Sequence, residues 1–180
     1  SSAASDVYKR QLQGQPVLVV GGGAVAERKI RLLLAAGAEV AVAAPRLTRQ
    51  LRAWAGEGRL RHLGDSYAAE QLDGRRLVFA ATGDSAVNQA VFRDAESRGV
   101  LVNAVDDQAH CRFISPAVIE RGPVQIAIST GGASPVLARR LRSRIEALLP
   151  AGLGGVAEAA RSLRSRVKRL LPAAARKRFW

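Results

Sequence analysis

The sequence predicts an α/β fold in which strands and helices alternate around a parallel sheet, followed by a β-hairpin and a basic helical tail. Three observations support this prediction. Short β-branched apolar runs recur between segments with helical spacing, a glycine cluster separates the first run from the first helix, and the pattern changes after Asp107. Strands that alternate with helices form twisted parallel sheets with right-handed crossovers.

The first half of the chain supplies the sheet. Residues 16–20 form a continuous apolar run, which is typical of a strand buried on both faces. Residues 24–36 have helical spacing, and Gly37 follows where a left-handed cap is wanted. The remaining expected elements are a strand at 38–44, a helix at 47–55, strands at 60–63 and 77–82, a helix at 85–98 and a strand at 101–105.

The second half predicts a hairpin and two helices. Residues 113–130 hold two β-rich runs around a Gly-Pro turn at 122–123. Ser134 can cap the next helix, with Pro135 in its first turn and Pro150 at its end. A last helix is expected at 156–171, with an apolar stripe made by Val156, Ala160, Leu163, Val167 and Leu170. Since these elements bury too little core to stand alone, we expect a homodimer built through this region.

Length and composition bound the organisation. A chain of 180 residues that is 48% hydrophobic can bury one main domain and an appendage. We expect a dinucleotide-binding domain at 11–113, a dimerisation hairpin and helix at 114–150, and a helical domain with a linker at 151–180. The first ten residues carry no strand or helix pattern, so we treat them as non-native and infer nothing from them.

The chain has no membrane or disulfide signature. No stretch approaches the roughly 20 apolar residues of a spanning helix, and the start lacks the order of a signal peptide. The single Cys111 cannot form an internal disulfide, and His62 and His110 make no structural zinc pattern with it. We therefore expect a soluble protein of the reducing cytoplasm.

Positive charge is concentrated at the end of the chain. Residues 130–180 hold twelve Lys or Arg against Glu146 and Glu158, which is +10 of the net +13. Three explanations stay open: a solvated helix face, a nucleic-acid-binding tail, and a surface that attracts a highly anionic small molecule or a partner. The tail has no interleaved aromatic residues before Phe179, which weighs against single-strand recognition.

A glycine loop joins the first strand to the first helix. Gly21, Gly22 and Gly23 are followed by the small Ala26, in the spacing of a Rossmann-like dinucleotide site. Gly21 allows the tight turn, Gly23 lets the backbone approach a pyrophosphate, and Ala26 lets the helix pack close to the strand. The free N–H groups at the helix start favour an anion there. We therefore expect a bound dinucleotide.

The identity of the dinucleotide is less sharply indicated. The second strand ends without an Asp or Glu to hold the ribose diol of NAD. Arg46 either faces the 2′-phosphate of NADP or points to solvent. Thr82, Gly83 and Asp84 end the fourth strand at the same sheet edge, where they either line the nicotinamide side or form an ordinary turn and helix cap.

Two adjacent carboxylates, Asp106 and Asp107, follow the fifth strand. Ligands of doubly wound folds bind at the carboxyl edge of the sheet, so these residues are expected beside the cofactor. One of them is the best candidate for a general base or a metal-handling group. The alternative is a cap or turn residue.

The chain is identified as a member of a known family on four stretches. "VLVVGGGAVAERKIRLLLAAGAEV" (17–40), "ATGDSAVNQAVFRDAESRGVLVNAVDD" (81–107), "FISPAVIERGPVQIAISTGGASPVLARRLRSRIEALLP" (113–150) and "RKRFW" (176–180) resemble the amino-terminal half of siroheme synthase. That half is the precorrin-2 dehydrogenase and sirohydrochlorin ferrochelatase module. The resemblance implies NAD-dependent oxidation of precorrin-2 to sirohydrochlorin, followed by insertion of ferrous iron, a substrate, to give siroheme.

The resemblance also implies roles for particular residues. Asp106 would serve both steps as the base, with Asp107 as a neighbour that raises its pKa. The cofactor contacts would come from Ala24, Val25, Pro45 and Arg46, and the carboxylates of the anionic tetrapyrrole would meet Arg139, Arg140 and Arg142.

Other consequences of the resemblance are less direct. Some relatives carry a phosphorylated serine where Thr130 stands; Thr130 could accept phosphate or be a plain turn residue. His110 and Cys111 are expected to be loop and packing residues without a metal. Full-length relatives continue into an S-adenosylmethionine-dependent methyltransferase domain, so we expect a fragment that ends at the linker. The competing hypotheses are a dehydrogenase without chelatase activity and a nucleotide-sensing or nucleic-acid-binding module.

Overall fold

The computed structural model describes residues 12–105, 107–113, 116–172 and 175–176. The structure divides into two compact units, residues 1–114 and 115–180. None of the described helices combines the length and the apolar character that crossing a bilayer requires.

The first unit is a five-stranded parallel sheet with the strand order β3-β2-β1-β4-β5. This confirms the predicted α/β, Rossmann-like class. Its strands and helices, in chain order, are β1 (Pro16–Val20), α2 (Ala24–Ala35), β2 (Glu39–Ala43), α3 (Arg49–Gly56), β3 (Arg61–Gly64), the 3₁₀ helix η1 (Ala69–Leu72), β4 (Leu77–Ala80), α4 (Ser85–Arg98), β5 (Leu101–Ala104) and the 3₁₀ helix η2 (Gln108–His110).

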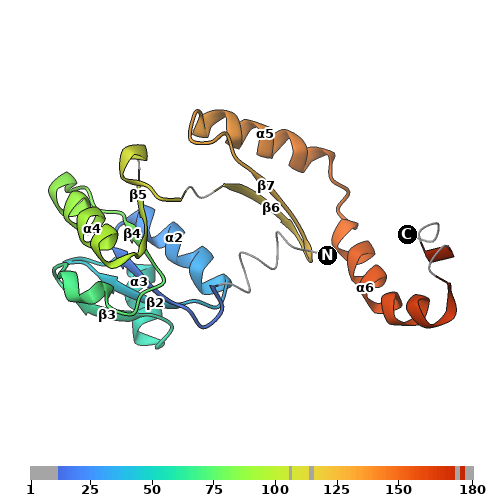
Figure 1. Ribbon diagram of the computed structural model, residues 1–180, viewed down its shortest axis with the longest axis horizontal. Helices are drawn as coiled ribbons and strands as arrows, with labels where there is room; N and C mark the ends of the chain where they lie inside the picture. Colours follow the sequence, from blue (N-terminus) through green and yellow to red (C-terminus); the bar gives the residue numbers. More distant parts are fainter. Residues whose placement is uncertain (1–11, 106, 114–115, 173–174, 177–180) are drawn as a thin grey trace. The chain divides into compact units, whose positions relative to one another are not determined.

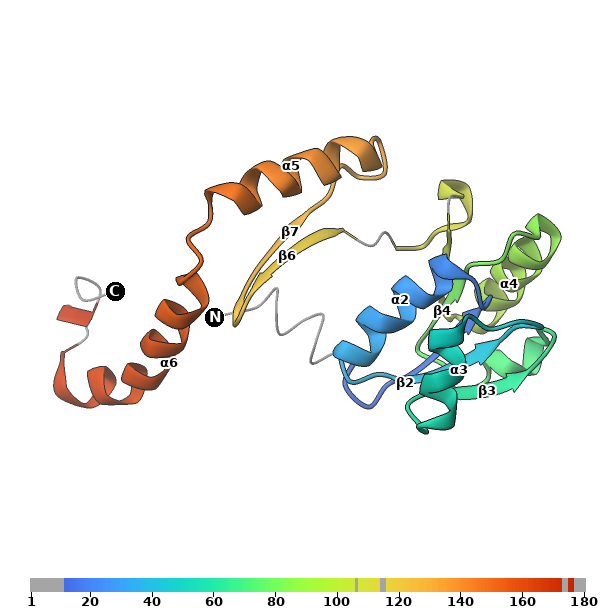
Figure 2. The same ribbon diagram turned by 180° about the vertical axis from the view of Figure 1, so that it is seen from behind.

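Alternate residues of β1 enter two separate cores, one on each face of the sheet. Val17 and Val19 pack with buried residues of α2 and α3, whereas Leu18 and Val20 pack with α4. Successive side chains of a strand point to opposite faces, so a strand apolar at every position is buried on both. The helices accordingly cover both faces of the sheet (Figure 1 and Figure 2).

The element bounds differ from the predicted ones for local reasons. The helix expected at 47–55 begins at Arg49 because Thr48 caps it, accepting a hydrogen bond from Leu51 N over 3.2 Å. Gly37 takes the left-handed conformation expected after α2, with φ of 74°. Between β3 and β4 the connection contains only η1, whose Leu72 is fully buried.

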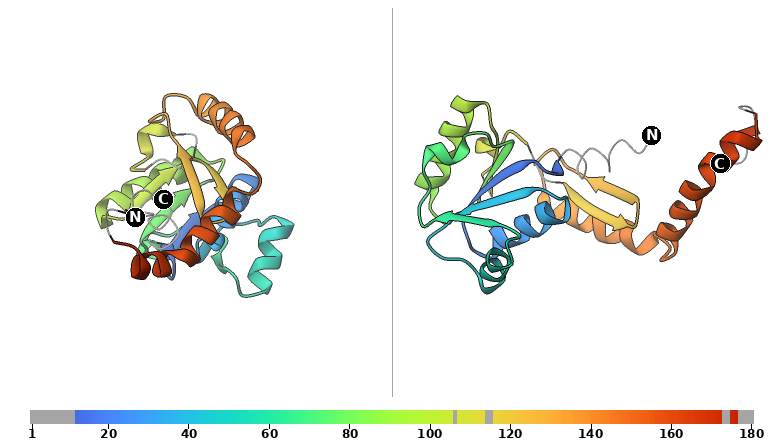
Figure 3. Two further views of the ribbon diagram at one scale, coloured as in Figure 1. Left: turned by 90° about the vertical axis from the view of Figure 1, so that its right-hand side faces the viewer. Right: turned by 90° about the horizontal axis from the view of Figure 1, so that it is seen from below.

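The second unit contains the predicted hairpin and two helices. These elements are β6 (Ala117–Arg121), β7 (Val124–Ile128), α5 (Pro135–Leu148) and α6 (Leu153–Leu170). The strands pair antiparallel and α5 lies along the hairpin (Figure 3). Ser134 caps α5 as expected, accepting from Leu137 N over 3.2 Å. The last helix begins three residues earlier than the predicted 156, at Leu153.

The core of the second unit is small. Ile119, Ala138 and Val167 are its buried apolar residues among those that the structure describes. Of the stripe predicted for α6, Val167 is buried but three other members are exposed: Val156, Leu163 and Leu170. The start of α6 packs closely on the hairpin turn, because a Cβ on Gly154 would lie 2.9 Å from Arg121 O.

Candidate functional site

The candidate site lies where the strand order reverses. The chain adds β2 and β3 on one side of β1 and then crosses to place β4 and β5 on the other. In open parallel sheets, ligands bind outside the carboxyl ends of the strands at such a switch point. Here the two loops at that point are the glycine loop after β1 and residues 81–84 after β4.

The three glycines of the loop have different surroundings. A Cβ on Gly21, whose φ is 124°, would lie 2.3 Å from Ala81 O. A Cβ on Gly22 would lie 2.1 Å from Arg46 O, whereas one on Gly23 would meet no heavy atom within 4 Å. Gly21 and Gly22 are therefore required by contacts within the protein. Gly23 leaves open space beside its backbone, as close approach of a phosphate group requires.

The start of α2 has no capping side chain. Gly23 precedes the helix and offers none, while α3, α4 and α5 begin with Thr48, Asp84 and Ser134, each of which accepts from a first-turn N–H. A first turn without a side-chain cap leaves backbone donors and the positive end of the helix dipole for an anion. Ala26 is fully buried, as its predicted packing role requires.

The loop after β2 is tied to the glycine loop and α2. Thr48 N donates to Gly22 O over 3.0 Å, and Thr48 Oγ1 donates to Glu27 Oε2 over 2.7 Å. Pro45 and Arg46 are exposed beside these contacts, and Arg46 forms no ion pair with another described residue. Neither Glu27 nor Thr48 was predicted from the sequence as part of the site; of the two, only Thr48 has a local signal, its helix-capping pattern.

The loop after β4 is held by Asn88. Thr82 N and Oγ1 approach Asn88 Oδ1 at 3.3 and 2.8 Å, and Asn88 Nδ2 donates to Thr82 O over 3.1 Å. Asp84 caps α4, accepting from Ala86 N over 2.8 Å. The backbone N of the predicted cofactor residue Thr82 lies 3.2 Å from the Cβ position of Gly21, and the Thr82 hydroxyl is hydrogen-bonded within the protein. Asn88 has no local sequence signal for this role.

The segment after β5 carries the predicted carboxylates. Asp106 lies outside the described residues. Its neighbour Val105 donates from its backbone N to Ala80 O over 2.8 Å, which attaches Val105 to the carboxyl end of β4. Asp107 Oδ2 lies 2.5 Å from His110 Nδ1.

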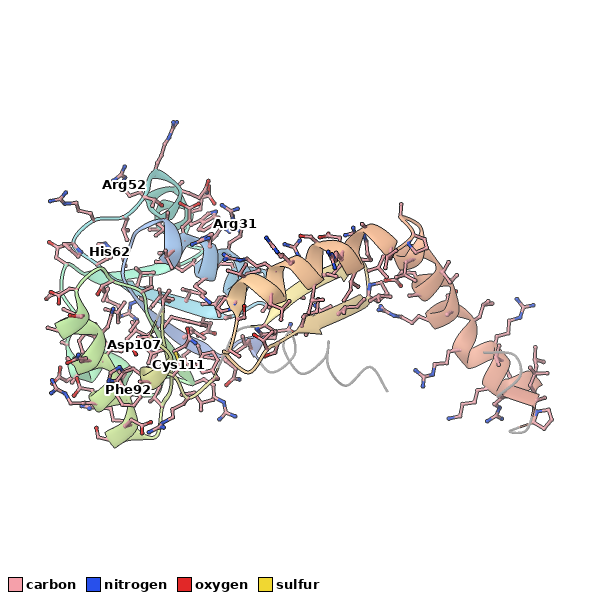
Figure 4. All side chains as sticks on the ribbon, turned by 90° about the horizontal axis from the view of Figure 1, so that it is seen from above. Arg31, Arg52, His62, Phe92, Asp107 and Cys111 are labelled. Carbon is pink, nitrogen blue, oxygen red and sulfur yellow. The ribbon has the colours of Figure 1, made fainter. Side chains whose placement is uncertain are left out.

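His110, at the end of η2, and Cys111 pack against neighbouring residues of the first unit. The His110 ring meets Phe92 of α4 edge to face, with centroids 4.7 Å apart. Cys111 Sγ donates to Ala104 O over 3.0 Å, and burial raises the pKa of this thiol, with the Asp107 charge adding to the effect. Phe92, Asp107 and Cys111 lie close to one another in the first unit (Figure 4). Within the described ranges, no three His, Cys, Asp or Glu side chains form a group that could hold a metal ion.

Asn103 closes the return of the chain beside β5. It is the one buried polar residue of the described core, and its Nδ2 donates to Phe113 O over 2.7 Å. Arg112 N donates to Val102 O over 2.8 Å, and the Nε and Nη2 groups of Arg112 donate to the two carboxylate oxygens of Glu96 in α4. Residues 111–113 therefore run back along the edge of β5.

The predicted substrate arginines lie on α5 in the second unit. Arg139 and Arg140 are exposed and line a shallow depression with Val136, Ser143 and Arg144. Arg142 instead donates to Glu146 over 2.9 Å, and Glu146 also pairs with Arg121 of β6 at 3.2 Å. The first two arginines are thus available to an anion, while Arg142 is paired with Glu146 of its own helix, the residue that also pairs with Arg121 of the hairpin.

Thr130 lies at the turn before α5. Its Oγ1 donates to Ser134 O and accepts from Ser134 N, both over 3.1 Å. The partly buried hydroxyl therefore shapes the turn that leads into the helix cap. Its modification stays a prediction.

Comparison with known proteins matches nearly the whole chain. Residues 10–117 match the family described as "Putative NAD(P)-binding", and residues 121–148 match "Sirohaem biosynthesis protein central". A siroheme synthase of Serratia proteamaculans is 52% identical over 94% of this chain and 36% of its own length, and one of Neisseria meningitidis is 54% identical over 94% and 35%. The chain thus spans about a third of the length of these curated relatives.

A solved structure extends the likeness to three dimensions. A precorrin-2 dehydrogenase superposes with a TM-score of 0.78 and 31% sequence identity, covering 93% of this chain and 82% of that one. The match therefore includes both units of the chain.

Proposed function

The chain belongs to the siroheme synthase family, as its NAD(P)-binding amino-terminal module, and from this premise we propose that it oxidises precorrin-2 to sirohydrochlorin. The observation that carries the proposal is the glycine loop at the switch point of the sheet. Gly21 and Gly22 are closed in by Ala81 and Arg46, and Gly23 alone of the three is open.

The residues present fit a dinucleotide. When bound, the nicotinamide accepts a hydride from the tetrapyrrole. The chain contributes the uncapped N–H groups at the start of α2 for the pyrophosphate, with Ala24 and Val25 in its first turn. The loop after β2, with Pro45 and Arg46, would lie along the adenosine half. We propose NAD as the cofactor, with Arg46 solvent-exposed; a strong preference for NADP would instead assign Arg46 to the 2′-phosphate.

Asp106 is proposed as the general base. It follows Val105, whose backbone is attached to the end of β4, the strand whose loop contacts Gly21. A carboxylate at this edge of the sheet can accept the proton that the macrocycle loses as hydride departs. Asp107 is a weaker candidate because its carboxylate is paired with His110 at 2.5 Å.

The same base would serve iron insertion. Ferrous iron enters as a substrate, and the carboxylate of Asp106 would take protons from the pyrrole nitrogens as the metal replaces them. The alternative is a dehydrogenase without chelatase activity. Loss of the sirohydrochlorin spectrum that depends on iron and exceeds the uncatalysed rate would establish the second activity, and loss at the uncatalysed rate would exclude it.

We also propose that the chain acts as a homodimer in the reducing cytoplasm. The second unit exposes large apolar side chains on α5 and α6, among them Leu137 at 49% and Leu148 at 81% exposed. Large exposed apolar side chains gathered on so small a unit favour association. Leu137→Glu and Leu148→Glu should shift sedimentation to the monomer, while Leu32→Glu on α2, at a side chain 67% exposed in the first unit, should leave it unchanged.

The direct experiment follows NADH formation with precorrin-2 and NAD under anaerobic conditions. Asp106→Asn should abolish turnover while NADH binding, measured by fluorescence, stays at the wild-type level, because the amide cannot accept the proton. Asp107→Asn is the matched control and should retain most activity. Equal turnover by wild type and Asp106→Asn would disprove the assignment of the base.

A further inference from the structure

Among the residues that the structure describes, the side chain of Asn88 hydrogen-bonds to one residue, Thr82. Asn88 lies in the first turns of α4, and all three of its hydrogen bonds reach Thr82: Oδ1 is within 3.3 Å of Thr82 N and 2.8 Å of Thr82 Oγ1, and Nδ2 donates to Thr82 O over 3.1 Å. Both backbone polar groups of Thr82 are thereby satisfied by one amide. This fixes the position of Thr82 relative to the helix.

Asn88 is not needed to start the helix. Asp84 already caps α4, accepting from Ala86 N at 2.8 Å and from Val87 N at 3.3 Å. Asp84 N in turn donates to Thr82 Oγ1 over 3.1 Å. Because Asp84 already caps the helix, capping does not explain the hydrogen bonds of the Asn88 side chain.

Thr82 forms part of the wall behind the glycine loop. The Cβ position of Gly21 is 2.3 Å from Ala81 O and 3.2 Å from Thr82 N, so the backbone of one loop lies close against the backbone of the other. A displacement of Thr82 would be transmitted directly to the turn that positions Gly23. Asn88, Thr82 and Gly21 thus form a continuous path from α4 to the candidate dinucleotide site.

The β4–α4 loop exposes backbone at Gly83. Gly83 is exposed, and a Cβ there would meet no heavy atom within 4 Å. The Thr82 hydroxyl, by contrast, has protein partners for both its proton and its lone pairs. The geometry assigns Asn88 as a positioning residue for the dinucleotide, which holds the β4–α4 loop against the glycine loop and leaves the Gly83 backbone free for the cofactor. This inference rests on the proposed dinucleotide-dependent function.

The test compares Asn88→Ala and Asn88→Asp with wild type in NADH binding, measured by fluorescence titration well below the melting temperature. Asn88→Asp keeps the size of the side chain but removes the donor to Thr82 O. Both variants should raise the Kd for NADH about tenfold, the change that ~1.4 kcal/mol produces. Gln89→Ala, at the exposed neighbouring position, is the matched control and should bind as wild type does.

Two further measurements separate positioning from a general loss of stability. In the dehydrogenase assay, the KM for NAD should rise in the Asn88 variants. The KM for precorrin-2 should stay within about twofold of the wild-type value, a change that corresponds to ~0.4 kcal/mol. Thr82→Val should weaken NADH binding as Asn88→Ala does, and the double variant should be no worse than either, because both break one path. Thr82→Ser, which keeps the hydroxyl, should bind NADH as wild type does.

The outcomes are distinct. Wild-type affinity in both Asn88 variants, with or without a lowered melting temperature, would overturn the inference and leave the proposed function standing. Additive losses from Thr82→Val and Asn88→Ala would also overturn it. Failure of the wild-type protein itself to bind NADH would instead refute the proposed function and this inference together.

Discussion

The side-chain amide of Asn103 in β5 donates a 2.7 Å hydrogen bond to the backbone carbonyl of Phe113. The bond joins the strand to the segment that returns beside it, and Phe113 then packs edge to face on Phe79 of β4 with centroids 5.3 Å apart. One buried polar side chain therefore joins Asn103 to Phe113, the two residues between which Asp106 and Asp107 stand in the sequence.

Replacing Asn103 should be costly. Asn103→Leu keeps the approximate size of the side chain but leaves Phe113 O without its donor, so we expect a loss of about 1–3 kcal/mol in the free energy of unfolding. Urea denaturation checks this value. Leu101→Ala on the same strand is the control, since Leu101 is 47% exposed and its truncation should cost much less. Equal losses in the two variants would contradict a special role for the bond.

The glycine loop offers a second contrast. Gly22→Ala places a methyl group 2.1 Å from Arg46 O, so the backbone must move and stability should fall by about 1–3 kcal/mol. Gly23→Ala meets no atom within 4 Å and has an ordinary φ of −84°, so the fold should keep its melting temperature.

NADH binding should be sensitive to Gly23→Ala even though the stability of the fold is not. Gly23→Ala puts its methyl group where a pyrophosphate approaches the backbone, and the Kd for NADH should rise by about tenfold or more. The measurements are thermal unfolding and fluorescence titration on both variants. A Gly23→Ala protein that binds NADH like wild type would remove the glycine loop from the cofactor site.

The fold was largely predictable because its signals are local. The doubly buried β1, the helix at 24–35, the cap by Ser134 and the Gly-Pro turn each follow from residues adjacent in sequence. The bound at Arg49 was missed by two residues because capping by Thr48 outweighs the apolar pattern before it. The strand order and η1 depend on packing between distant segments, which periodicity does not encode.

The site was only partly predictable for the same reason. The positions of Gly21, Gly22 and Gly23 follow from a motif with a known backbone requirement. Asn88 and Asn103 carry no such motif, since their partners Thr82 and Phe113 lie six and ten residues away along the chain and meet them only in the folded sheet. The exposure of the apolar stripe of α6 could not be predicted either. A helical pattern shows that one face is apolar, but it does not reveal whether the surface that covers this face belongs to the same chain.

The arginines of α5 should divide into two classes. Arg139→Ala and Arg140→Ala remove exposed charges, so we expect an unchanged melting temperature and a KM for precorrin-2 raised about threefold. Arg142→Ala removes one of the two partners of Glu146, which also pairs with Arg121. Its main effect should therefore be a loss of about 0.5–1 kcal/mol in the free energy of unfolding.

A charge-matched control tests the assignment of these arginines. Arg161→Ala removes one positive charge from α6, where Arg161 is paired at 3.6 Å with Glu158 on a well-exposed face. It should change neither the KM for precorrin-2 nor the melting temperature. An equal rise in KM for Arg161→Ala and Arg139→Ala would show that net charge, rather than the face of α5, attracts the substrate.

Cys111 provides a pH-dependent readout of the segment after β5. It is the single cysteine of the chain, so thiol labelling reports on it alone. Burial raises the pKa of its thiol, the charge of Asp107 raises it further, and Lys29 opposes the shift. Because the thiolate is the reactive form, alkylation by iodoacetamide should reach its half-maximal rate at a pH above the value of about 8.5 for a free cysteine. In concentrated urea the midpoint should return to that ordinary value.

The same shift fixes the direction of the stability change. The folded state holds the Cys111 proton to higher pH than the unfolded state, so the stability associated with this thiol is present below the unfolded pKa and is lost as pH rises through the folded pKa. Cys111→Ser should flatten that part of the profile when unfolding is followed by urea between neutral and alkaline pH. A folded-state labelling midpoint at or below that of free cysteine would mean that the thiolate is stabilised, and would contradict the burial of Cys111 against Ala104.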